Sequence, residues 1–271
     1  MIKTINKEAL RSNVHRNPAV KVACIGDSAR TAMALMVKEG IEDVGFICYD
    51  KLPLTEETIR NDFLDAHFLI VMGTDDDAAL FNSVGHISRS NSLLTVGLCI
   101  SSAQPCPLET DAFDTLFLTP VDQLVSSNQS ASDFLNLACA GLAEVLGYKQ
   151  RLTIDFCDIK YVLTQKGQSA IGVGTGVGSN RAVNAVNSAL AQPTFAGADF
   201  NTARGALLIL KASSQIFNSE LRPAVEALGR AERKYLSAHS LSDEATCLVT
   251  VVEGGNFADE LRATIVVTGM S

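Results

Sequence analysis

The fold of the first half of the chain is decided by one short stretch, Val20-Lys21-Val22-Ala23-Cys24-Ile25-Gly26-Asp27-Ser28. Its first six residues contain a single polar side chain, which predicts a strand buried on both faces. Gly26 then permits a tight turn, and Ser28 is a candidate cap for a following helix. A strand, a glycine turn and a helix start are the elements of a phosphate site, although one glycine at a strand exit is more often simply a turn.

The predicted helix presents an apolar face to the core, and Gly40 supplies a left-handed stop. That face consists of Ala32, Met33, Met36 and Val37. Further short apolar runs follow at residues 45–49, 68–72, 93–100 and 115–118. Strands with little polar alternation between helical segments indicate a doubly wound α/β unit with a parallel sheet.

The second half of the chain begins after a polar break at residues 126–130. Residues 132–146 are apolar nearly all round, which predicts a buried helix. Helices at 180–191 and 219–236 and strands at 205–211, 246–253 and 262–268 follow. We therefore expect an α/β protein: a Rossmann-like N-terminal domain (1–127) with a mostly parallel sheet, a central core helix (128–150) and a smaller α+β C-terminal domain (151–271).

Composition excludes several classes of function. The net charge of -8 and the lack of Lys or Arg runs argue against nucleic-acid binding. No signal peptide is recognisable, and no apolar run reaches the roughly 18 residues that cross a bilayer, so we expect a cytoplasmic protein without direct membrane insertion. The seven cysteines lack CxxC spacing and nearby His pairs. We interpret them as reduced core residues and expect no metal site.

Three motifs in the second half resemble the FtsZ family of the FtsZ/tubulin superfamily. They are Ile154-Asp155-Phe156-Cys157-Asp158-Ile159, then Gly172-Val173-Gly174-Thr175-Gly176 followed by Asn180-Arg181-Ala182, and Asp259-Glu260-Leu261-Arg262-Ala263-Thr264-Ile265-Val266-Val267-Thr268-Gly269. The first resembles the acidic loop of the family and the last its closing strand. The glycine run alone also suggests a dinucleotide loop, but the resemblance puts it in the C-terminal domain, remote from any nucleotide. More weakly, Asp114-Thr115-Leu116 and Thr119-Pro120-Val121-Asp122 resemble the stretch near the ribose and base pocket.

The resemblance implies that GTP lies over strand ends of the N-terminal domain and that the acidic loop of the next subunit completes the site. Asp155 and Asp158 are then the candidate catalytic residues, acting in trans on water or on a cation–nucleotide complex. Thr153 stands where the family has asparagine, which weakens this expectation. The alternative is that Asp155 and Asp158 only cap the next helix.

The receiving side departs from the family. Of its glycine-rich phosphate loop only Gly73 remains, followed by Thr74-Asp75-Asp76-Asp77, and the short polar segment 51–65 stands where a second glycine-rich loop is expected. A carboxylate 4 Å from a phosphate charge costs on the order of 4 kcal/mol at an effective dielectric near 20. Gly26, Gly73 and Asp122 remain as candidate residues of a remnant nucleotide site. The three aspartates also suit Mg²⁺ or the start of a helix.

We therefore expect a divergent FtsZ-like protein with a degenerate GTP-binding loop, a pseudo-GTPase without a cofactor that acts on FtsZ filaments in cell division. Its expected partner is FtsZ or another FtsZ-like subunit, with a homo-oligomer also possible. Because Gly269-Met270-Ser271 directly follows the last predicted strand, we do not expect recruitment by membrane anchors. One alternative is a GTP- or GDP-binding protein, or a GTPase, with a remodelled pocket. Another is a scaffold that self-assembles without nucleotide.

Overall fold

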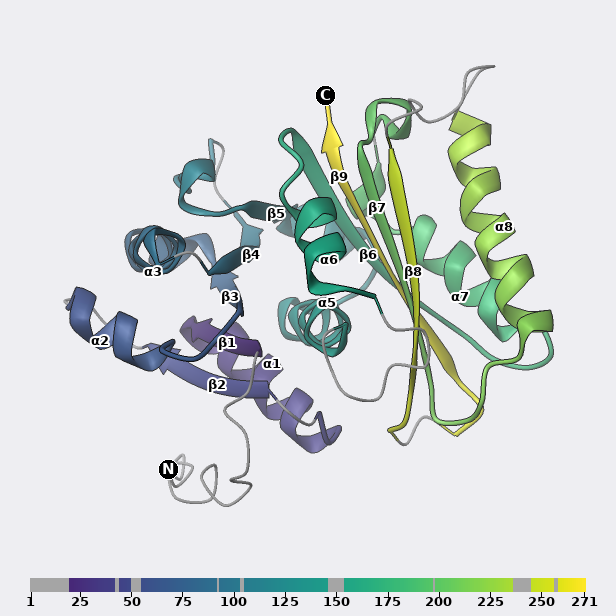
Figure 1. The fold of residues 1–271 in the computed structure, drawn as a ribbon, viewed down its shortest axis with the longest axis horizontal. Coiled ribbons are helices and arrows are strands. Elements are labelled where there is room, and N and C mark those ends of the chain that lie inside the picture. Colours follow the sequence, from purple (N-terminus) through teal and green to yellow (C-terminus); the bar gives the residue numbers. More distant parts are fainter. Residues whose placement is uncertain are drawn as a thin grey trace.

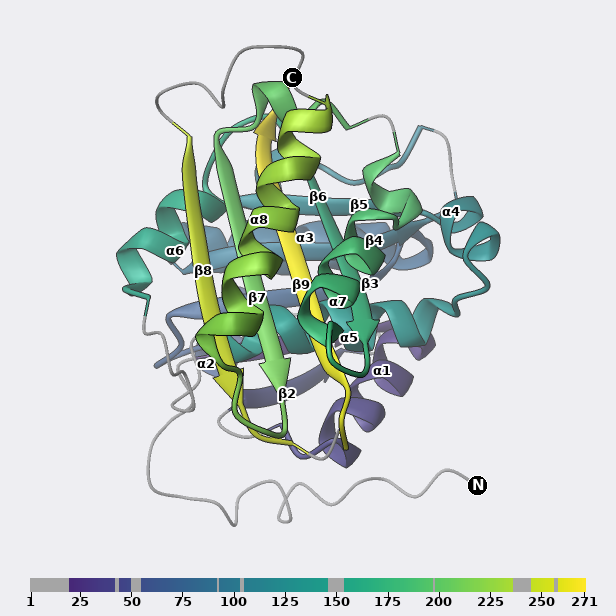
Figure 2. The ribbon, with the colours of Figure 1, turned by 90° about the vertical axis from the view of Figure 1, so that its right-hand side faces the viewer.

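The computed structural model describes residues 20–41, 44–49, 55–91, 93–102, 105–145, 154–196, 198–235, 245–255 and 258–271. Two sheets lie on either side of a central helix, α5 (Ala131–Glu144) (Figure 1). In the view of Figure 2, the strands of one sheet cross those of the other. Thr153, at which the acidic loop departs from the family, and residues 51–54 lie outside the described residues.

The first sheet has five strands in the order β2-β1-β3-β4-β5, and every neighbouring pair is parallel. Its strands are β1 (Val20–Ile25), β2 (Val44–Tyr49), β3 (Phe68–Thr74), β4 (Leu94–Ser101) and β5 (Thr115–Pro120). Helices α1 (Gly26–Lys38) and α5 pack on one face. Helices α2 (Glu56–Asp62) and α3 (Ala78–Ser90) pack on the other. The predicted doubly wound parallel sheet is confirmed.

Two local expectations about α1 were wrong. The helix begins at Gly26, so Ser28 lies inside it and does not cap it. Val37 is 50% exposed, whereas Ala32 and Met36 are fully buried. The predicted stop is confirmed, because Gly40 adopts a left-handed φ of +74° just after the helix.

The second sheet has four strands in the order β6-β9-β7-β8. The strands are β6 (Gln168–Gly176), β7 (Gly205–Ala212), β8 (Thr246–Glu253) and β9 (Leu261–Met270). β9 is antiparallel to both neighbours, and β7 is parallel to β8. Helices α7 (Arg181–Leu190) and α8 (Asn218–Tyr235) cover the face that points away from α5 (Figure 1). This mixed sheet with helices is the predicted α+β unit.

The glycine run predicted to be structural lies in β6. A Cβ atom at Gly174 would be 2.2 Å from the backbone nitrogen of Ala189, and one at Gly176 would be 2.1 Å from the carbonyl oxygen of Arg181. Ala189 and Arg181 both belong to α7. The glycines therefore let the helix approach the strand closely.

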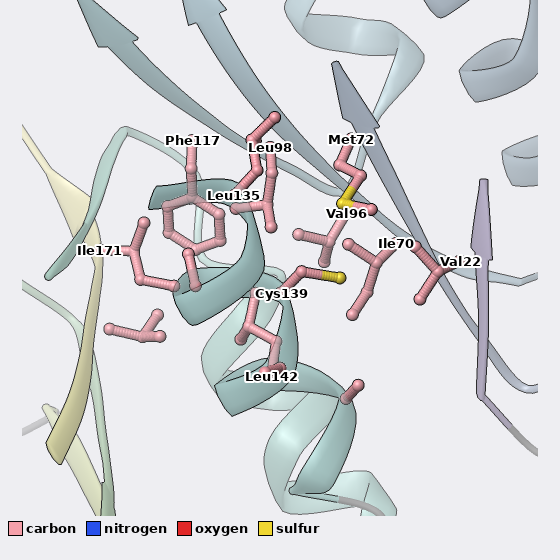
Figure 3. Close-up of a cluster of buried hydrophobic side chains, with 14 of the residues drawn as sticks. Val22, Ile70, Met72, Val96, Leu98, Phe117, Leu135, Cys139, Leu142 and Ile171 are labelled. Atoms are coloured by element: carbon pink, nitrogen blue, oxygen red, sulfur yellow. The ribbon is translucent and has the colours of Figure 1, made fainter. Parts of the chain in front are cut away.

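The central helix is buried in a core that both sheets share. Leu135, Cys139 and Leu142 of α5 contact a cluster that includes Phe117 of the first sheet and Ile171 of the second (Figure 3). The helix begins at Ser130, whose side chain accepts a hydrogen bond from the backbone N–H of Asp133. The described parts of the three predicted segments, 1–127, 128–150 and 151–271, therefore share one core. None of the helices among the described residues is long and apolar enough to cross a membrane.

Candidate functional site

The carboxyl ends of the parallel strands gather the residues predicted to form a remnant nucleotide site. Gly26 follows β1, Asp75–Asp77 (η2) follows β3, and Asp122 lies in the first turn of α4 (Val121–Ser126), directly after β5. In an open parallel sheet this edge is where ligands bind. Gly26 has a φ of +81°, which favours glycine at this turn. β3 and β4 separate β1 from β5, so Asp122 lies farther along the edge from Gly26 than Asp75 does.

Asp75 is turned into the protein and does not face solvent. Asp75 is only 7% exposed, and its two carboxylate oxygens accept hydrogen bonds from the backbone N–H of Ser102 at 3.0 and 2.9 Å. It also accepts bonds from the hydroxyls of Ser101 (2.7 Å) and Ser102 (3.0 Å). An internal carboxylate therefore occupies hydrogen-bond donors at the carboxyl ends of β3 and β4.

This arrangement corrects the expectation that three carboxylates face the phosphate position. Only Asp76 and Asp77 are exposed, and Asp76 accepts a hydrogen bond from the hydroxyl of Thr74 at 3.0 Å. Asp77 lies beside the first turn: a Cβ atom on Gly26 would be 3.4 Å from its Oδ2. Asp77 therefore places a negative charge beside Gly26, which opposes an anion there.

Gly73 has a packing role. It is buried in β3, and a Cβ atom at this position would lie 2.8 Å from the carbonyl oxygen of Ile25 and 3.4 Å from the ring of Phe81. The glycine therefore allows β1 and β3 to lie close together. Atoms of Ile25 and Phe81 already occupy the space that a side chain at this position would need.

The two acidic-loop residues lie on the first turn of α6 (Phe156–Leu163). Asp155 is the N-cap, and its carboxylate accepts a hydrogen bond from the backbone N–H of Cys157 at 2.8 Å. Asp158 is exposed in the same turn. Asp155 therefore caps α6, as the alternative interpretation predicted. The cap uses one oxygen of its exposed carboxylate, and the second oxygen can still contact another group.

Helix α6 lies at the amino edge of the first sheet, opposite the remnant site. The ring of Phe156 is 6.4 Å from that of His67, which immediately precedes β3. At the other end of α6, the hydroxyl of Thr115, the first residue of β5, donates to the carbonyl oxygen of Leu163. Figure 2 shows α6 and α4 beyond opposite ends of the strands of this sheet. Within one chain, the predicted catalytic residues and the predicted nucleotide residues are therefore kept apart.

Sequence reasoning missed the serine pair at the end of β4. Ser101 and Ser102 directly follow a run of buried residues, which is the signal that could have identified them as strand-end hydrogen-bond donors. It also missed a second group of polar side chains. Among the described residues, His86, Glu109 and Asp111 have donor atoms within 4.8 Å of one another. His86 Nε2 lies 2.8 Å from the Glu109 carboxylate, a contact that holds the segment before β5 against α3.

Comparison with known proteins identifies FtsZ proteins among those to which the chain is similar. Residues 167–271 match the model of the FtsZ family, C-terminal domain. The chain is similar to the cell division protein FtsZ of Coxiella burnetii, with 31% identity over 147 residues, 54% of this chain and 36% of that protein. It is similar to that of Wigglesworthia glossinidia brevipalpis, with 29% identity over 167 residues, 58% of this chain and 41% of that protein. The chain thus spans less than half the length of these curated relatives.

The fold is also similar to solved structures over nearly the whole chain. An empty FtsZ dimer from M. jannaschii superposes with a TM-score of 0.80 at 20% identity, covering 97% of this chain and 91% of that one. A TubZ from Bacillus thuringiensis serovar israelensis, in GDP-form protofilaments, gives a TM-score of 0.57 at 11% identity and covers 97% and 88%. These likenesses show the fold.

Proposed function

We propose that this chain, which belongs to the FtsZ/tubulin superfamily, acts in cell division by binding FtsZ through its acidic α6 edge without binding GTP in the manner of the family. Its amino edge docks on the GTP-bearing face of an FtsZ subunit. Its carboxyl edge does not accept nucleotide, so the filament does not continue from it. The protein then caps filaments or changes their turnover.

The observation that carries this proposal is the buried Asp75 carboxylate. Ser102 N–H and the hydroxyls of Ser101 and Ser102 donate to it, although donors at the ends of parallel strands are those that a phosphate needs. A phosphate must therefore displace an internal anion that is already paired. Asp77 beside Gly26 adds a second negative charge at the same edge.

The exposure of α6 supports the docking half of the proposal. Asp155 and Asp158 are exposed on its first turn, and Tyr161, three residues after Asp158, is 50% exposed. Residues three apart on a helix lie on one face. This face therefore offers a carboxylate and an aromatic ring to a partner. The opposite placement of the two edges suits head-to-tail contact between subunits.

The proposal is tested by titrating the purified protein into polymerising FtsZ. We expect substoichiometric protein to reduce sedimented polymer and to change the rate of GTP hydrolysis. Unchanged polymer mass together with unchanged hydrolysis would reject the proposal.

Charge-removing variants locate the contact. Asp155→Asn keeps a good N-cap residue and Asp158→Asn keeps the side-chain size, so both should fold. We expect the double variant to bind FtsZ at least tenfold more weakly, a loss of about 1.4 kcal/mol. Glu57→Gln, which removes an exposed acidic group from the first turn of α2, is the matched control and should bind like the parent. Equal binding by all of these variants would place the contact elsewhere.

One observation favours the alternative of a remodelled nucleotide pocket. Helix α1 has 13 residues and begins at Gly26 with no side-chain cap, so its first N–H groups point toward the carboxyl edge. Calorimetry against GTP, GDP and ATP, with and without Mg²⁺, distinguishes the two proposals: micromolar binding favours the pocket and no heat favours the capping role. Light scattering without nucleotide tests the further alternative of a self-assembling scaffold.

A further inference from the structure

Two cysteines lie side by side at the carboxyl end of the first sheet. Cys24 of β1 and Cys48 of β2 are direct partners in the parallel register. Neighbouring strands are about 4.8 Å apart, which is inside the Cα separation of about 4.4–6.8 Å that a disulfide spans. β2 is the edge strand and has a single neighbour in the sheet, so it can adjust to a new cross-link with little disturbance.

The two thiols have different environments. Cys48 is exposed, whereas Cys24 is fully buried in the core against α1. The Sγ atom of Cys48 lies 3.5 Å from the Sδ atom of Met33 in α1. A soluble reagent therefore meets Cys48 first, and Cys24 is the thiol placed behind it.

Electrostatics favours the Cys48 thiolate. The hydrogen bond from Cys24 lowers the pKa of Cys48 to about 7, and the charge of Arg30 acts in the same direction against the opposing effect of burial. The same hydrogen bond and burial raise the pKa of Cys24. The lowered pKa gives Cys48 a larger thiolate fraction at pH 7 than that of a surface thiol with an ordinary pKa near 8.5.

We propose that Cys48 is a hydroperoxide-reactive cysteine and that Cys24 resolves its oxidised form into a Cys24–Cys48 disulfide. The geometry that carries this is the direct register of an exposed and a buried thiol on neighbouring strands. The cross-link joins edge strand β2 to β1 two residues before the turn at Gly26.

The chemistry is a two-electron oxidation. The Cys48 thiolate attacks the terminal oxygen of a hydroperoxide, forming an S–O bond and breaking the O–O bond, and the released alkoxide takes a proton to become an alcohol. Cys24 then attacks the sulfenic sulfur of Cys48. The S–S bond forms, the S–O bond breaks, and the hydroxide leaves as water with the proton from Cys24. Two thiols and one hydroperoxide thus give one disulfide, one alcohol and one water.

The test is peptide mapping of the full chain after brief treatment with a small excess of tert-butyl hydroperoxide at pH 7 and alkylation of the remaining thiols. We expect a Cys24–Cys48 linked peptide pair and a loss of about 2 Da from the intact mass. Cys157, an exposed cysteine in α6, is the internal control and should react roughly tenfold more slowly. Oxidation of Cys48 only to sulfinic acid, or a disulfide between two chains, would overturn the proposal.

Two variants separate the roles of the thiols. In Cys24→Ala we expect the sulfenic acid of Cys48 to accumulate, because no thiol resolves it. Dimedone should trap this sulfenic acid, and excess hydroperoxide should oxidise it further. In Cys48→Ser, a change at an exposed position, Cys24 should stay reduced. Modification of Cys24 at the parental rate in Cys48→Ser would contradict the proposal. If either variant fails to fold, the peptide mapping of the oxidised parent protein still tests the proposal.

Discussion

Arg262 of β9 and Glu39, which follows α1, form an ion pair with 3.3 Å between Nη1 and Oε2, although 223 residues separate them. Asn136 of α5 donates to the other oxygen of the same carboxylate at 2.9 Å. Close by, Lys211 of β7 is paired with Glu144 at the end of α5. Charged contacts therefore join the C-terminal sheet to α5 and to the end of α1, in addition to the shared apolar core. Both helices pack on the first sheet, so these contacts tie the second sheet to the helix layer between the two.

The Lys211–Glu144 pair yields a stability prediction. The two side chains are only 9% and 11% exposed, and burial raises the pKa of Glu144 against the effect of Lys211. Lys211→Ala leaves this carboxylate buried without its cation, so we expect the free energy of unfolding to fall by about 3–5 kcal/mol in urea denaturation. Lys211→Met combined with Glu144→Leu should recover most of this loss. A single change in the exposed pair Arg222–Glu226 should cost less than about 1 kcal/mol.

Asp75 should matter for stability, whereas Asp76 should not. Asp75→Asn replaces an acceptor-only carboxylate by an amide whose NH₂ group faces the donors at Ser101 and Ser102, and we expect a loss of about 1–3 kcal/mol. Asp76→Asn, one residue away and exposed, should change the free energy of unfolding by less than about 0.5 kcal/mol. Thermal unfolding of both variants side by side measures the difference, and equal losses would contradict the buried network.

Two glycine substitutions, one in the contact between β6 and α7 and one in α8, should have opposite effects on stability. In Gly174→Ala the new methyl group would overlap the backbone of Ala185 and Ala189, so we expect a loss of at least about 1–3 kcal/mol. Gly229 lies in α8, and no atom of the described residues outside its own stretch of helix lies within 4 Å of a Cβ position there. Gly229→Ala should therefore stabilise the protein by about 0.5–1 kcal/mol. Denaturant midpoints of the two variants test both signs.

Glu220 should make stability depend on pH in the acidic range. Burial raises its pKa, but hydrogen bonds from Arg181 and from the backbone N–H of Phe217 outweigh this and lower the pKa overall. A carboxyl with a lowered pKa stabilises the fold above its unfolded pKa of about 4.3 and loses this contribution as pH falls through the folded pKa. Glu220→Gln should therefore be less stable than the parent at pH 7, with a difference that shrinks below pH 4. A difference independent of pH would show that the charge has no role.

Local features of the chain were predicted well because they depend on residues near one another in the sequence. The strands Val20–Ile25 and Thr246–Glu253 have the predicted bounds, and Gly40 ends α1 with a left-handed φ. Continuous apolar runs and a glycine after a helix carry this information within a few positions. Ser28 was misassigned because Gly26 already allows the helix to begin directly after β1.

The sequence by itself determined the five strands of the first sheet, the last three strands of the second, the buried central helix and the absence of a glycine-rich loop at Thr74-Asp75-Asp76-Asp77, but not β6 or α2. Only the tertiary structure decided which of three adjacent aspartates is buried, because the answer depends on Ser101 and Ser102, 26 and 27 residues away. It also decided that Asp155 and Asp158 lie at the opposite edge of the sheet from Gly26. Apolar periodicity reports which residues avoid water, whereas the partner of a buried carboxylate depends on how strands pair in space.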